Sequence, residues 1–221
     1  MVYDDFVLMA DGGSGPEFNY AVVFGPVAPE RVFASAGSFF DATGYAVVVE
    51  SESAQPMEDA VRAGGWRLDE EEPALVLSPI PVAPPPPIGL TIRLVVTEAG
   101  FTDFMALSQN ARRWIPSLQA ALDPAVALFV GYYRGEQVAT SRVTCYRDVG
   151  DINGVVTVTA YQRRGFGTAM TWAAIVEGTR RGCVAMTLTA TAMGYTLYLR
   201  LGFVPVCTYR TYLPPSRSRA P

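Results

Sequence analysis

The chain contains no histidine and no lysine, so all 17 of its basic residues are arginine. The lack of histidine excludes Ser-His-Asp and Cys-His catalysis and most catalytic zinc sites. The lack of lysine excludes a P-loop, whose pattern ends in G-K-[ST]. Cysteine is scarce as well: Cys145, Cys183 and Cys207 lie far apart and form no C-x-x-C pair, which favours buried free thiols in a reducing cytoplasm.

Long apolar runs and an excess of positive charge are also missing. No run approaches the roughly 20 apolar residues needed to cross a bilayer, and the acidic start at residues 1–6 does not resemble a signal peptide. A net charge of −4 argues against nucleic acid as the main partner. Because 50% of the 221 residues are apolar, the chain can bury one large core or two smaller ones. Together, these observations predict a cytoplasmic globular protein without a membrane or nucleic-acid partner.

The most informative stretch reads TVTAYQRRGFG and ends at Gly167. An apolar strand there leads into a basic turn, and a helix is predicted to follow. Gly165 and Gly167 let a ligand approach the backbone, and the helix start offers unpaired N–H groups and a positive dipole end. Arg163 and Arg164 can pair with phosphates through their guanidinium groups. A dinucleotide fingerprint is excluded because Met170 stands where its third glycine would be, so the stretch predicts another kind of phosphate-binding loop.

The motif Q-R-R-G-F-G resembles the pyrophosphate loop of the GNAT superfamily of N-acetyltransferases, whose pattern is Q/R-x-x-G-x-G/A. The resemblance continues beyond the loop. Residues 168–181 predict an amphipathic helix, residues 184–191 a buried strand and residues 193–202 a short second helix. In the family this second helix ends in a motif like L-Y-x-x-L-G-F, which here runs from Leu197 to Phe203. Two motifs in this order are far more specific than either alone.

The resemblance implies an α/β (α+β) protein with the GNAT acyl-CoA acyltransferase fold, a mixed central sheet with splayed parallel strands flanked by helices. Acetyl-coenzyme A would bind as co-substrate, with no metal, in the gap between the splayed strands. The strand before the loop would offer backbone groups to the thioester and the pantetheine arm, and the loop amides would hold the pyrophosphate. The residues implied to bind the cofactor are Val156, Thr157, Val158, Arg163, Arg164, Gly165, Phe166, Gly167 and Thr168.

Tyr198, in the second motif, is the residue predicted to act in catalysis. Matched to the family motif, it is the general acid that protonates the leaving thiolate of coenzyme A. Its unperturbed pKa of roughly 10 keeps it protonated at neutral pH. From the residues alone, the alternative is an aromatic side chain of a helix that packs on the sheet.

The general base is less clear, because the usual histidine is absent. The family reaction is direct attack of the substrate amine on the thioester, so a carboxylate within one water of the amine suffices. Glu98, Asp148 and Asp151 are candidates, although each also fits a solvated turn residue. The family often has an acidic residue shortly before the loop, where this chain has Thr159 and Ala160. That departure puts base catalysis from this strand in doubt.

The predicted function is transfer of an acetyl group from acetyl-coenzyme A to a primary amine, by direct attack in a ternary complex. A small molecule is the expected acceptor, because two lobes would form a deep pocket. Acidic surface would favour a cationic amine, with Asp4, Asp5 and residues 70–72 as contributors or as plain solvated turns. The alternative is a non-catalytic acyl-coenzyme A binding or sensor module, which would bind the cofactor without turnover.

Prolines at residues 79–87, PIPVAPPPP, divide the chain. Four consecutive prolines prevent a helix and leave a stiff extended connector. The predicted parts are a first lobe at residues 1–80, a linker at 81–88, an N-acetyltransferase domain at 89–213 and a tail at 214–221. The elements predicted for the transferase domain follow the order βααβββαβαβ, with Trp114 where its first two helices meet around Pro116 and a hairpin across residues 134–136.

The first lobe is predicted to contain strands at residues 18–24 and 45–50, helices at 29–41 and 57–63, and a closing pair at 66–68 and 73–78. This order parallels residues 152–212 without the basic loop, because GPVAP stands at the matching point. We interpret the lobe as a smaller, degenerate GNAT-like half that cannot bind coenzyme A and that completes the acceptor pocket. The arrangement resembles a group of bacterial GNAT proteins with a vestigial amino-terminal lobe. Residues 204–213 predict a last strand that either pairs in a homodimer or closes the chain's own sheet.

Overall fold

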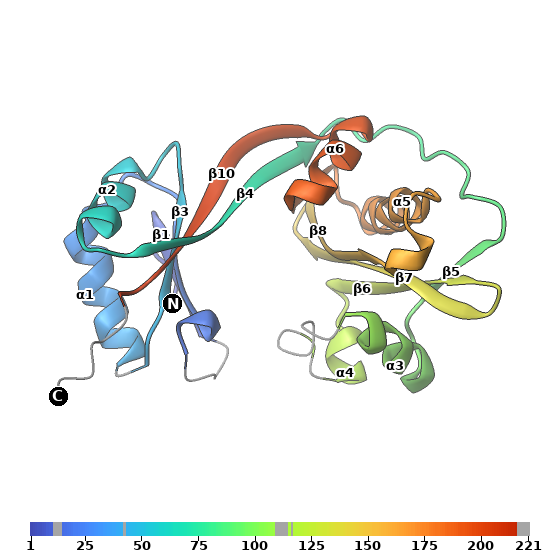
Figure 1. Cartoon of the computed structure of the whole chain (residues 1–221), viewed down its shortest axis with the longest axis horizontal. Helices are drawn as coiled ribbons and strands as arrows, with labels where there is room; N and C mark the ends of the chain where they lie inside the picture. The colour runs from blue at the N-terminus through green and yellow to red at the C-terminus, as the bar shows by residue number, and fades with distance from the viewer. Residues whose placement is uncertain (11–14, 42, 109–114, 116, 216–221) are drawn as a thin grey trace. The chain divides into compact units, whose positions relative to one another are not determined.

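The computed structural model describes residues 1–10, 15–41, 43–108, 115 and 117–215. The chain forms two compact units, one of Met1–Ala74 with Val206–Pro221 and one of Leu75–Pro205 (Figure 1). Strands β4 (Arg67–Leu77) and β10 (Val204–Leu213) each contribute residues to both units. This division joins residues 206–213 to the first unit, whereas the sequence-based boundary kept residues 89–213 together. The predicted division into separate domains, with one domain at residues 89–213, stays a prediction.

The first unit contains β1 (Phe6–Ala10), β2 (Asn19–Val23), α1 (Pro29–Phe40), β3 (Ala46–Glu50) and α2 (Gln55–Ala63). Strand β1 pairs antiparallel with β2, β2 parallel with β3, and β3 antiparallel with β10. From β2 to β4 the elements confirm the predicted order of strand, helix, strand, helix and strand. Strand β1 is an addition that the sequence pattern did not indicate.

One prediction about this unit is wrong. The sequence indicated two short strands at residues 66–68 and 73–78, but β4 is one strand of 11 residues. Residues 69–72 are acidic and have low strand propensity, and Pro73 has no N–H to donate, so the sequence pattern breaks there. Strand pairing overrides this local preference, because β4 lies between β10 and β9 in the strand order.

Strand β10 has a neighbour on each side, because the strand order is β1-β2-β3-β10-β4-β9-β8-β7-β6-β5. An interior strand has no free edge to offer to a second sheet. Residues 204–213 therefore close the chain's own sheet, which is one of the two arrangements expected from the sequence. A homodimer formed by adding this strand to a second copy lacks the free edge that it needs.

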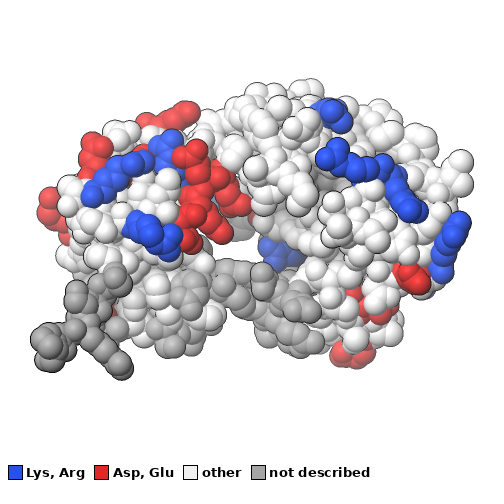
Figure 2. Space-filling view, viewed as in Figure 1, with Lys and Arg blue, Asp and Glu red and all other residues white. Residues whose placement is uncertain are grey.

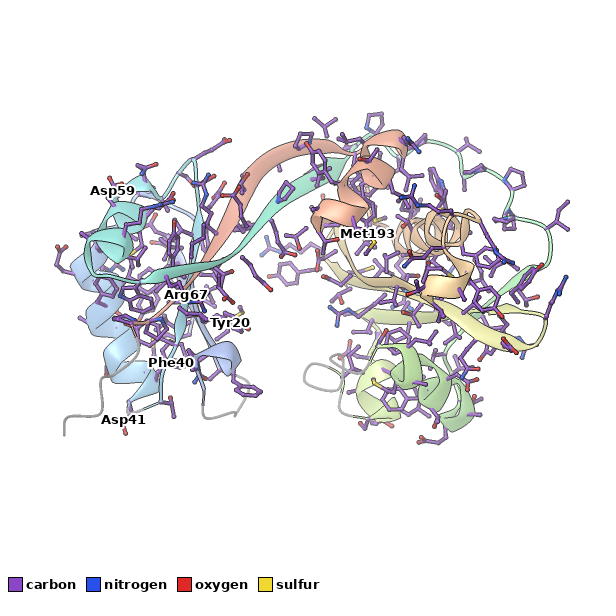
Figure 3. All side chains as sticks on the ribbon, in the orientation of Figure 1. Tyr20, Phe40, Asp41, Asp59, Arg67 and Met193 are labelled. Carbon is purple, nitrogen blue, oxygen red and sulfur yellow. The ribbon has the colours of Figure 1, made fainter. Side chains whose placement is uncertain are left out.

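The interior of the first unit holds a buried carboxylate, that of Glu58 in α2, which is 2% exposed. It accepts hydrogen bonds from Arg62 (2.6 Å), Arg210 (3.0 Å) and the hydroxyl of Tyr212 (2.7 Å). Burial alone raises the pKa of Glu58, but these hydrogen bonds bring it below its ordinary value. The paired charge fixes α2 to β10, and apolar side chains fill the rest of the space between helices and strands (Figure 3).

The second unit contains β5 (Leu90–Leu94), α3 (Glu98–Leu107), α4 (Leu118–Ala121), β6 (Val126–Tyr133), β7 (Glu136–Tyr146), β8 (Val149–Thr157), α5 (Phe166–Arg180), β9 (Ala185–Thr189) and α6 (Ala192–Arg200). Together with β10 these elements confirm the predicted order βααβββαβαβ. The hairpin of β6 and β7 is also confirmed. Trp114 and Pro116, predicted where the first two helices meet, lie outside the described residues.

Helices cover both faces of the sheet in the second unit (Figure 1). Helix α5 contacts β6, β7 and β8 on one face, and α3 contacts β6 and β7 on the other. Arg181 anchors the end of α5, because it donates hydrogen bonds to Glu177 and to the carbonyl oxygens of Pro124 and Val126. The mixed sheet flanked by helices is the architecture expected from the sequence. Among the described helices, none combines the length and the apolar character that a membrane span requires.

Candidate functional site

The parallel strands β8 and β9 part from each other soon after they start. They pair at Val149 with Ala185, at Gly150 with Met186 and at Asp151 with Thr187. Beyond Asp151, β8 continues to residue 157 and pairs only with β7, while no residue of β9 stands opposite it. The splayed parallel strands expected from the sequence are therefore present.

A bulge in β8 accompanies this parting. The register with β7 shifts between Thr140 and Arg142, where Gly154 and Val155 of β8 oppose a single residue. Gly154 has φ 60°, a left-handed conformation that costs glycine little. A bulge of this kind bends the strand, and the extra residue reverses the face of the sheet to which each later side chain points. Val155 and Thr157, rather than Val156, consequently line the pocket described below.

The start of α5 has no side-chain cap, in contrast to α3 and α6. Thr97 accepts a hydrogen bond from the amide of Gly100 (3.2 Å) at the start of α3, and Thr191 accepts one from that of Gly194 (3.3 Å) at the start of α6. At α5 the capping position is Gly165, with φ 78° and ψ 4°. The first N–H groups of a helix have no partner within the helix. Those of α5 are therefore available to an anion, which the helix dipole also favours.

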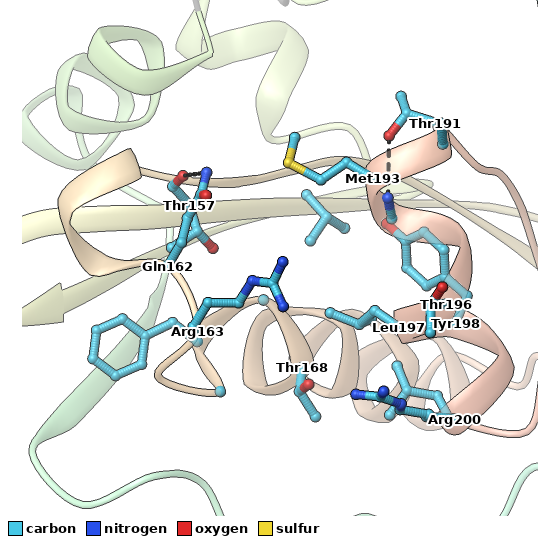
Figure 4. Close-up of a pocket in the computed structure, with 17 residues that line it drawn as sticks. Thr157, Gln162, Arg163, Thr168, Thr191, Met193, Thr196, Leu197, Tyr198 and Arg200 are labelled. Atoms are coloured by element: carbon cyan, nitrogen blue, oxygen red, sulfur yellow. Dashed lines mark hydrogen bonds between the residues drawn. The ribbon is translucent and has the colours of Figure 1, made fainter.

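A pocket of about 920 Å³ lies between the loop, α5, α6 and the end of β8 (Figure 4). Seven of the ten residues predicted for the site line it, namely Thr157, Arg163, Gly165, Phe166, Gly167, Thr168 and Tyr198. The other three, Val156, Val158 and Arg164, do not line it, and the predicted roles of all ten residues stay predictions. The sequence prediction gave no site role to the remaining lining residues, although Gln162, Leu197, Arg200 and Leu201 belong to the two motifs. These residues are Val155, Gln162, Thr191, Ala192, Met193, Gly194, Thr196, Leu197, Arg200 and Leu201.

Helical spacing is the signal that identifies three of these additional residues. Gly194, Leu197 and Leu201 stand four before, one before and three after Tyr198, on the same side of α6. Gly167 of α5 lies next to α6, because a Cβ there would be in van der Waals contact with Leu197 Cδ1, at 3.4 Å. The pocket wall on α6 therefore follows from the position of Tyr198 once the helix is recognised.

Two arginines bring positive charge to the pocket. Arg163 comes from the loop and Arg200 from the last turn of α6, and they lie on either side of Thr168 in Figure 4. Within the described part of the chain, neither guanidinium forms an ion pair with a carboxylate. Arg164 points elsewhere, because its guanidinium lies over the rings of Tyr133 (5.8 Å) and Tyr161 (5.3 Å). The pocket thus combines two unpaired cations with the positive end of a helix, which suits an anionic ligand.

Tyr198 reaches the pocket from α6 and is 9% exposed. Its ring packs edge to face on Phe203, with the ring centroids 5.9 Å apart. Gly194 leaves room for this ring, because a Cβ there would lie 2.9 Å from Tyr198 Cε2. Burial raises the pKa of Tyr198 above its ordinary value. The phenol therefore holds its proton at neutral pH and can give it to a stronger base.

The three candidate bases have different surroundings. Glu98, in the first turn of α3, and Asp148, in the turn before β8, are exposed to solvent. Asp151 ends the paired part of β8 and accepts hydrogen bonds from Thr187 (3.3 Å) and from Asn153. The side chain of Asp151 is exposed as well, so desolvation of its carboxyl group by neighbouring atoms raises its pKa only to a limited extent, and Arg142 and these hydrogen bonds oppose the rise. Asp151 is the candidate whose position and pKa both fit a base beside the gap.

The cysteines do not add a nucleophile to this site. Cys183 is buried and Cys145 and Cys207 are partly buried, and all three are free thiols. Burial raises the pKa values of Cys183 and Cys207 to about 11, which keeps both protonated at neutral pH. No group of three or more His, Cys, Asp or Glu side chains able to hold a metal occurs among the residues that the structure describes.

The acidic residues that the sequence suggested for a cationic acceptor belong to the first unit. Figure 2 shows acidic and basic side chains crowded together on this unit. Arg210 pairs with Glu71 (2.6 Å), and Arg67 pairs with Asp69 (2.9 Å). These ion pairs offset part of the acidic charge, so the run contributes less attraction for a cation than its composition suggests.

Comparison with known proteins gives one family and a set of similar folds. Residues 96–203 match the model of the Acetyltransferase (GNAT) family. No curated protein sequence matches the chain. The fold is similar to that of a GCN5-related N-acetyltransferase from Kribbella flavida, with 19% identity, a TM-score of 0.77, and coverage of 98% of this chain and 89% of that chain.

Two further solved structures share the fold. A GCN5-related N-acetyltransferase from Sphaerobacter thermophilus has 17% identity and a TM-score of 0.68, over 94% of this chain and 74% of that chain. A tandem GNAT protein from the clavulanic acid biosynthesis pathway has 14% identity and a TM-score of 0.64, over 96% of this chain and 80% of that chain. At such identities the likeness shows the fold alone.

Proposed function

Because the chain belongs to the acetyltransferase (GNAT) family, we propose that it transfers the acetyl group of acetyl-coenzyme A to a primary amine of a small molecule. The family makes acyl transfer the general chemistry of the chain. The observation that carries the specific proposal is the gap between β8 and β9, which leads to the uncapped start of α5. An extended pantetheine arm can pair with the free edge of β8 while its pyrophosphate meets the amides of residues 165–168.

The charged groups of the pocket fit the same ligand. Arg163 and Arg200 would each pair with phosphate oxygens, since neither has a carboxylate partner among the described residues. Arg200 is an addition to the residues that the family resemblance implied. Its position on α6 places a cation beside the same helix start that the loop surrounds (Figure 4).

The proposed reaction is a single displacement with two proton transfers. The acceptor amine, as its neutral free base, attacks the thioester carbonyl carbon, a C–N bond forms, and the C–S bond of the thioester breaks. Asp151 takes the proton that the nitrogen loses, directly or through one water, and Tyr198 gives its proton to the coenzyme A thiolate. The proton on Asp151 returns through solvent, so each group regains its starting state.

The first unit supports the proposal of a degenerate lobe that does not bind coenzyme A. Its helix α1 begins at Pro29, which has no N–H to donate to a phosphate. No second glycine or arginine stands in the segment GPVAP before it. The fold shared with a tandem GNAT protein over 96% of the chain agrees with two GNAT-like halves.

Acetyl-coenzyme A binding and thiol release test the proposed function together. We expect calorimetry to detect binding of acetyl-coenzyme A, and free thiol to appear faster when an acceptor amine is added. Binding without thiol release for any amine would favour the sensor alternative. Failure of the chain to bind acetyl-coenzyme A would contradict the proposal.

The pH dependence of the reaction tests Asp151 as the base. Only the deprotonated carboxylate accepts a proton, so kcat/KM should fall as pH drops through the pKa of Asp151, which desolvation by neighbouring atoms raises above the ordinary carboxyl value. The groups that face it are Arg142, Asn153 and Thr187. We expect Asp151→Asn to lower kcat by about 100-fold and to remove this acid limb from the profile.

The matched control is Asp148→Asn, because Asp148 is an exposed residue of the turn just before β8. It should keep both the rate and the acid limb. An acid limb that survives in Asp151→Asn would assign the titration to another group.

A further inference from the structure

A row of polar side chains crosses β7, β8 and β9 on the face of the sheet opposite α5. Gly150 and Ile152 of β8 belong to the α5 face, since a Cβ on Gly150 would lie 2.7 Å from Met186 Sδ and Ile152 packs in the core cluster of α5. Alternation along the strand directs Asp151 and Asn153 to the other face. The register places Arg142 opposite Asn153, and Thr187 opposite Asp151.

The β6 neighbour of Arg142 confirms which face this is. Leu128 stands opposite Arg142 in the register and packs with Phe101 and Phe104 of α3. The next polar pair on this face is Thr140 with Ser108, the residue that ends α3, whose hydroxyl oxygens lie 2.9 Å apart. The polar row therefore begins beside α3 and ends at the point where β8 and β9 part.

Arg142 is the unusual member of the row. Its Nε atom is buried and has no hydrogen-bond partner among the residues that the structure describes. Within the described residues the guanidinium forms no ion pair either, and Asp151 acts on it only as a nearby charge. Burial lowers the pKa of Arg142. A buried N–H group without a partner is costly, because it has lost water and gained nothing in exchange, and here that group is the Nε–H of Arg142.

We propose that Arg142 binds a carboxylate of the acceptor, so that the acceptor is an amino acid with a free carboxylate. This inference rests on the proposed function. The guanidinium offers a planar pair of donors that matches a carboxylate. Asp151, on the same face and at the start of the gap, faces the amine of the same molecule. One zwitterion thus satisfies both charges on binding, and its ammonium group loses one proton to solvent before the free amine attacks the thioester.

The same pair of charges disfavours a polyamine. A polyamine brings a second cation where an amino acid brings its carboxylate, and that cation would face the guanidinium of Arg142. The acidic run of the first unit, which suggested a cationic acceptor, is partly paired with Arg210 and Arg67. Arg142 is therefore a specificity-determining residue whose partner is supplied by the substrate.

The test compares acids with their amides on the full chain saturated with acetyl-coenzyme A. The probes are the standard α-amino acids, their α-carboxamides and the matching decarboxylated amines, assayed by thiol release, with binding measured by calorimetry in the presence of coenzyme A. We expect at least one acid to exceed its amide and its decarboxylated amine by roughly 10- to 100-fold in kcat/KM, since a lost hydrogen bond to a charged group costs that much. In Arg142→Met this preference should disappear through a rise in KM.

Variants and cofactor binding separate the possible failures. Arg142→Lys keeps the charge without the planar pair of donors and should retain part of the preference. Both variants must bind acetyl-coenzyme A as the parent does, which shows that they fold. Equal use of acids and amides by the parent, a preference that persists in Arg142→Met, or binding of none of the acids would overturn the inference. Loss of acetyl-coenzyme A binding by the parent would instead contradict the proposed function.

Discussion

Gly165→Glu is expected to weaken acetyl-coenzyme A binding by at least about 100-fold. Gly165 caps α5 with φ 78°, and a side chain in that conformation costs about 1–3 kcal/mol. The new carboxylate would also sit at the positive end of α5, where the pyrophosphate is proposed to bind, and would repel it. Every factor of ten in affinity corresponds to about 1.4 kcal/mol, so repulsion of the pyrophosphate, together with a strain-induced shift of the loop that presents the amides, accounts for the expected loss.

Gly182→Glu is the matched control, because it introduces the same residue at the other end of the same helix. Gly182 follows α5, has φ 97°, and has open space around its Cβ position. The backbone strain is therefore comparable, while the new charge lies far along the helix from its start. Calorimetry should show near-parental affinity for Gly182→Glu. Equal loss in both variants would mean that general destabilisation, rather than the loop, explains the effect.

The order of elements in the second unit could be predicted because its signals are local. Gly165 and Gly182 bracket α5, and apolar strands of ordinary length precede and follow it. The loop motif and the tyrosine motif then place Arg163, Gly167 and Tyr198 around one pocket. The order of elements needed only neighbouring residues, which is why it agrees with the structure, whereas the roles of Arg163, Gly167 and Tyr198 stay predictions.

The details that depend on strand register could not be predicted in the same way. The bulge at Gly154 and Val155 reverses which face of the sheet the following side chains of β8 point to. Its position is defined only by the pairing of β8 with β7. The dipeptide Asn153-Gly154 inside an apolar strand is the one sequence signal of it. Arg142 illustrates the same limit. Its proposed role in binding a carboxylate depends on its burial and on Asp151 and Thr187 in neighbouring strands, which the sequence does not show.

Strand β4 shows how long-range pairing overrides local preference. The acidic residues 69–72 and Pro73 predict a break, and an isolated peptide of this sequence has little tendency to form a strand. Neighbours on both sides supply the hydrogen bonds that keep β4 continuous. A local sequence pattern contains no information about which distant strands will pair with the segment, so it could not predict that β4 is continuous.

Tyr198→Phe is expected to lower kcat by roughly 100- to 10,000-fold, the usual range for removal of a general acid. The phenol is buried and burial raises its pKa, so it reaches the reaction protonated. Without the hydroxyl, the thiolate must leave unprotonated or take its proton from water. The ring still packs on Phe203 and still fills the space above Gly194. Affinity for acetyl-coenzyme A should therefore change little.

Tyr195→Phe is the control that separates chemistry from packing. Tyr195 lies one turn earlier in α6 and packs against the same core, but it is not among the residues that line the pocket. Its loss of a hydroxyl should leave kcat near the parental value. Single-turnover measurements on both variants compare the chemical step directly, because product release does not contribute to them. If Tyr198→Phe reacts as fast as Tyr195→Phe in that assay, water rather than the phenol protonates the thiolate, and the role of Tyr198 is to shape the pocket wall.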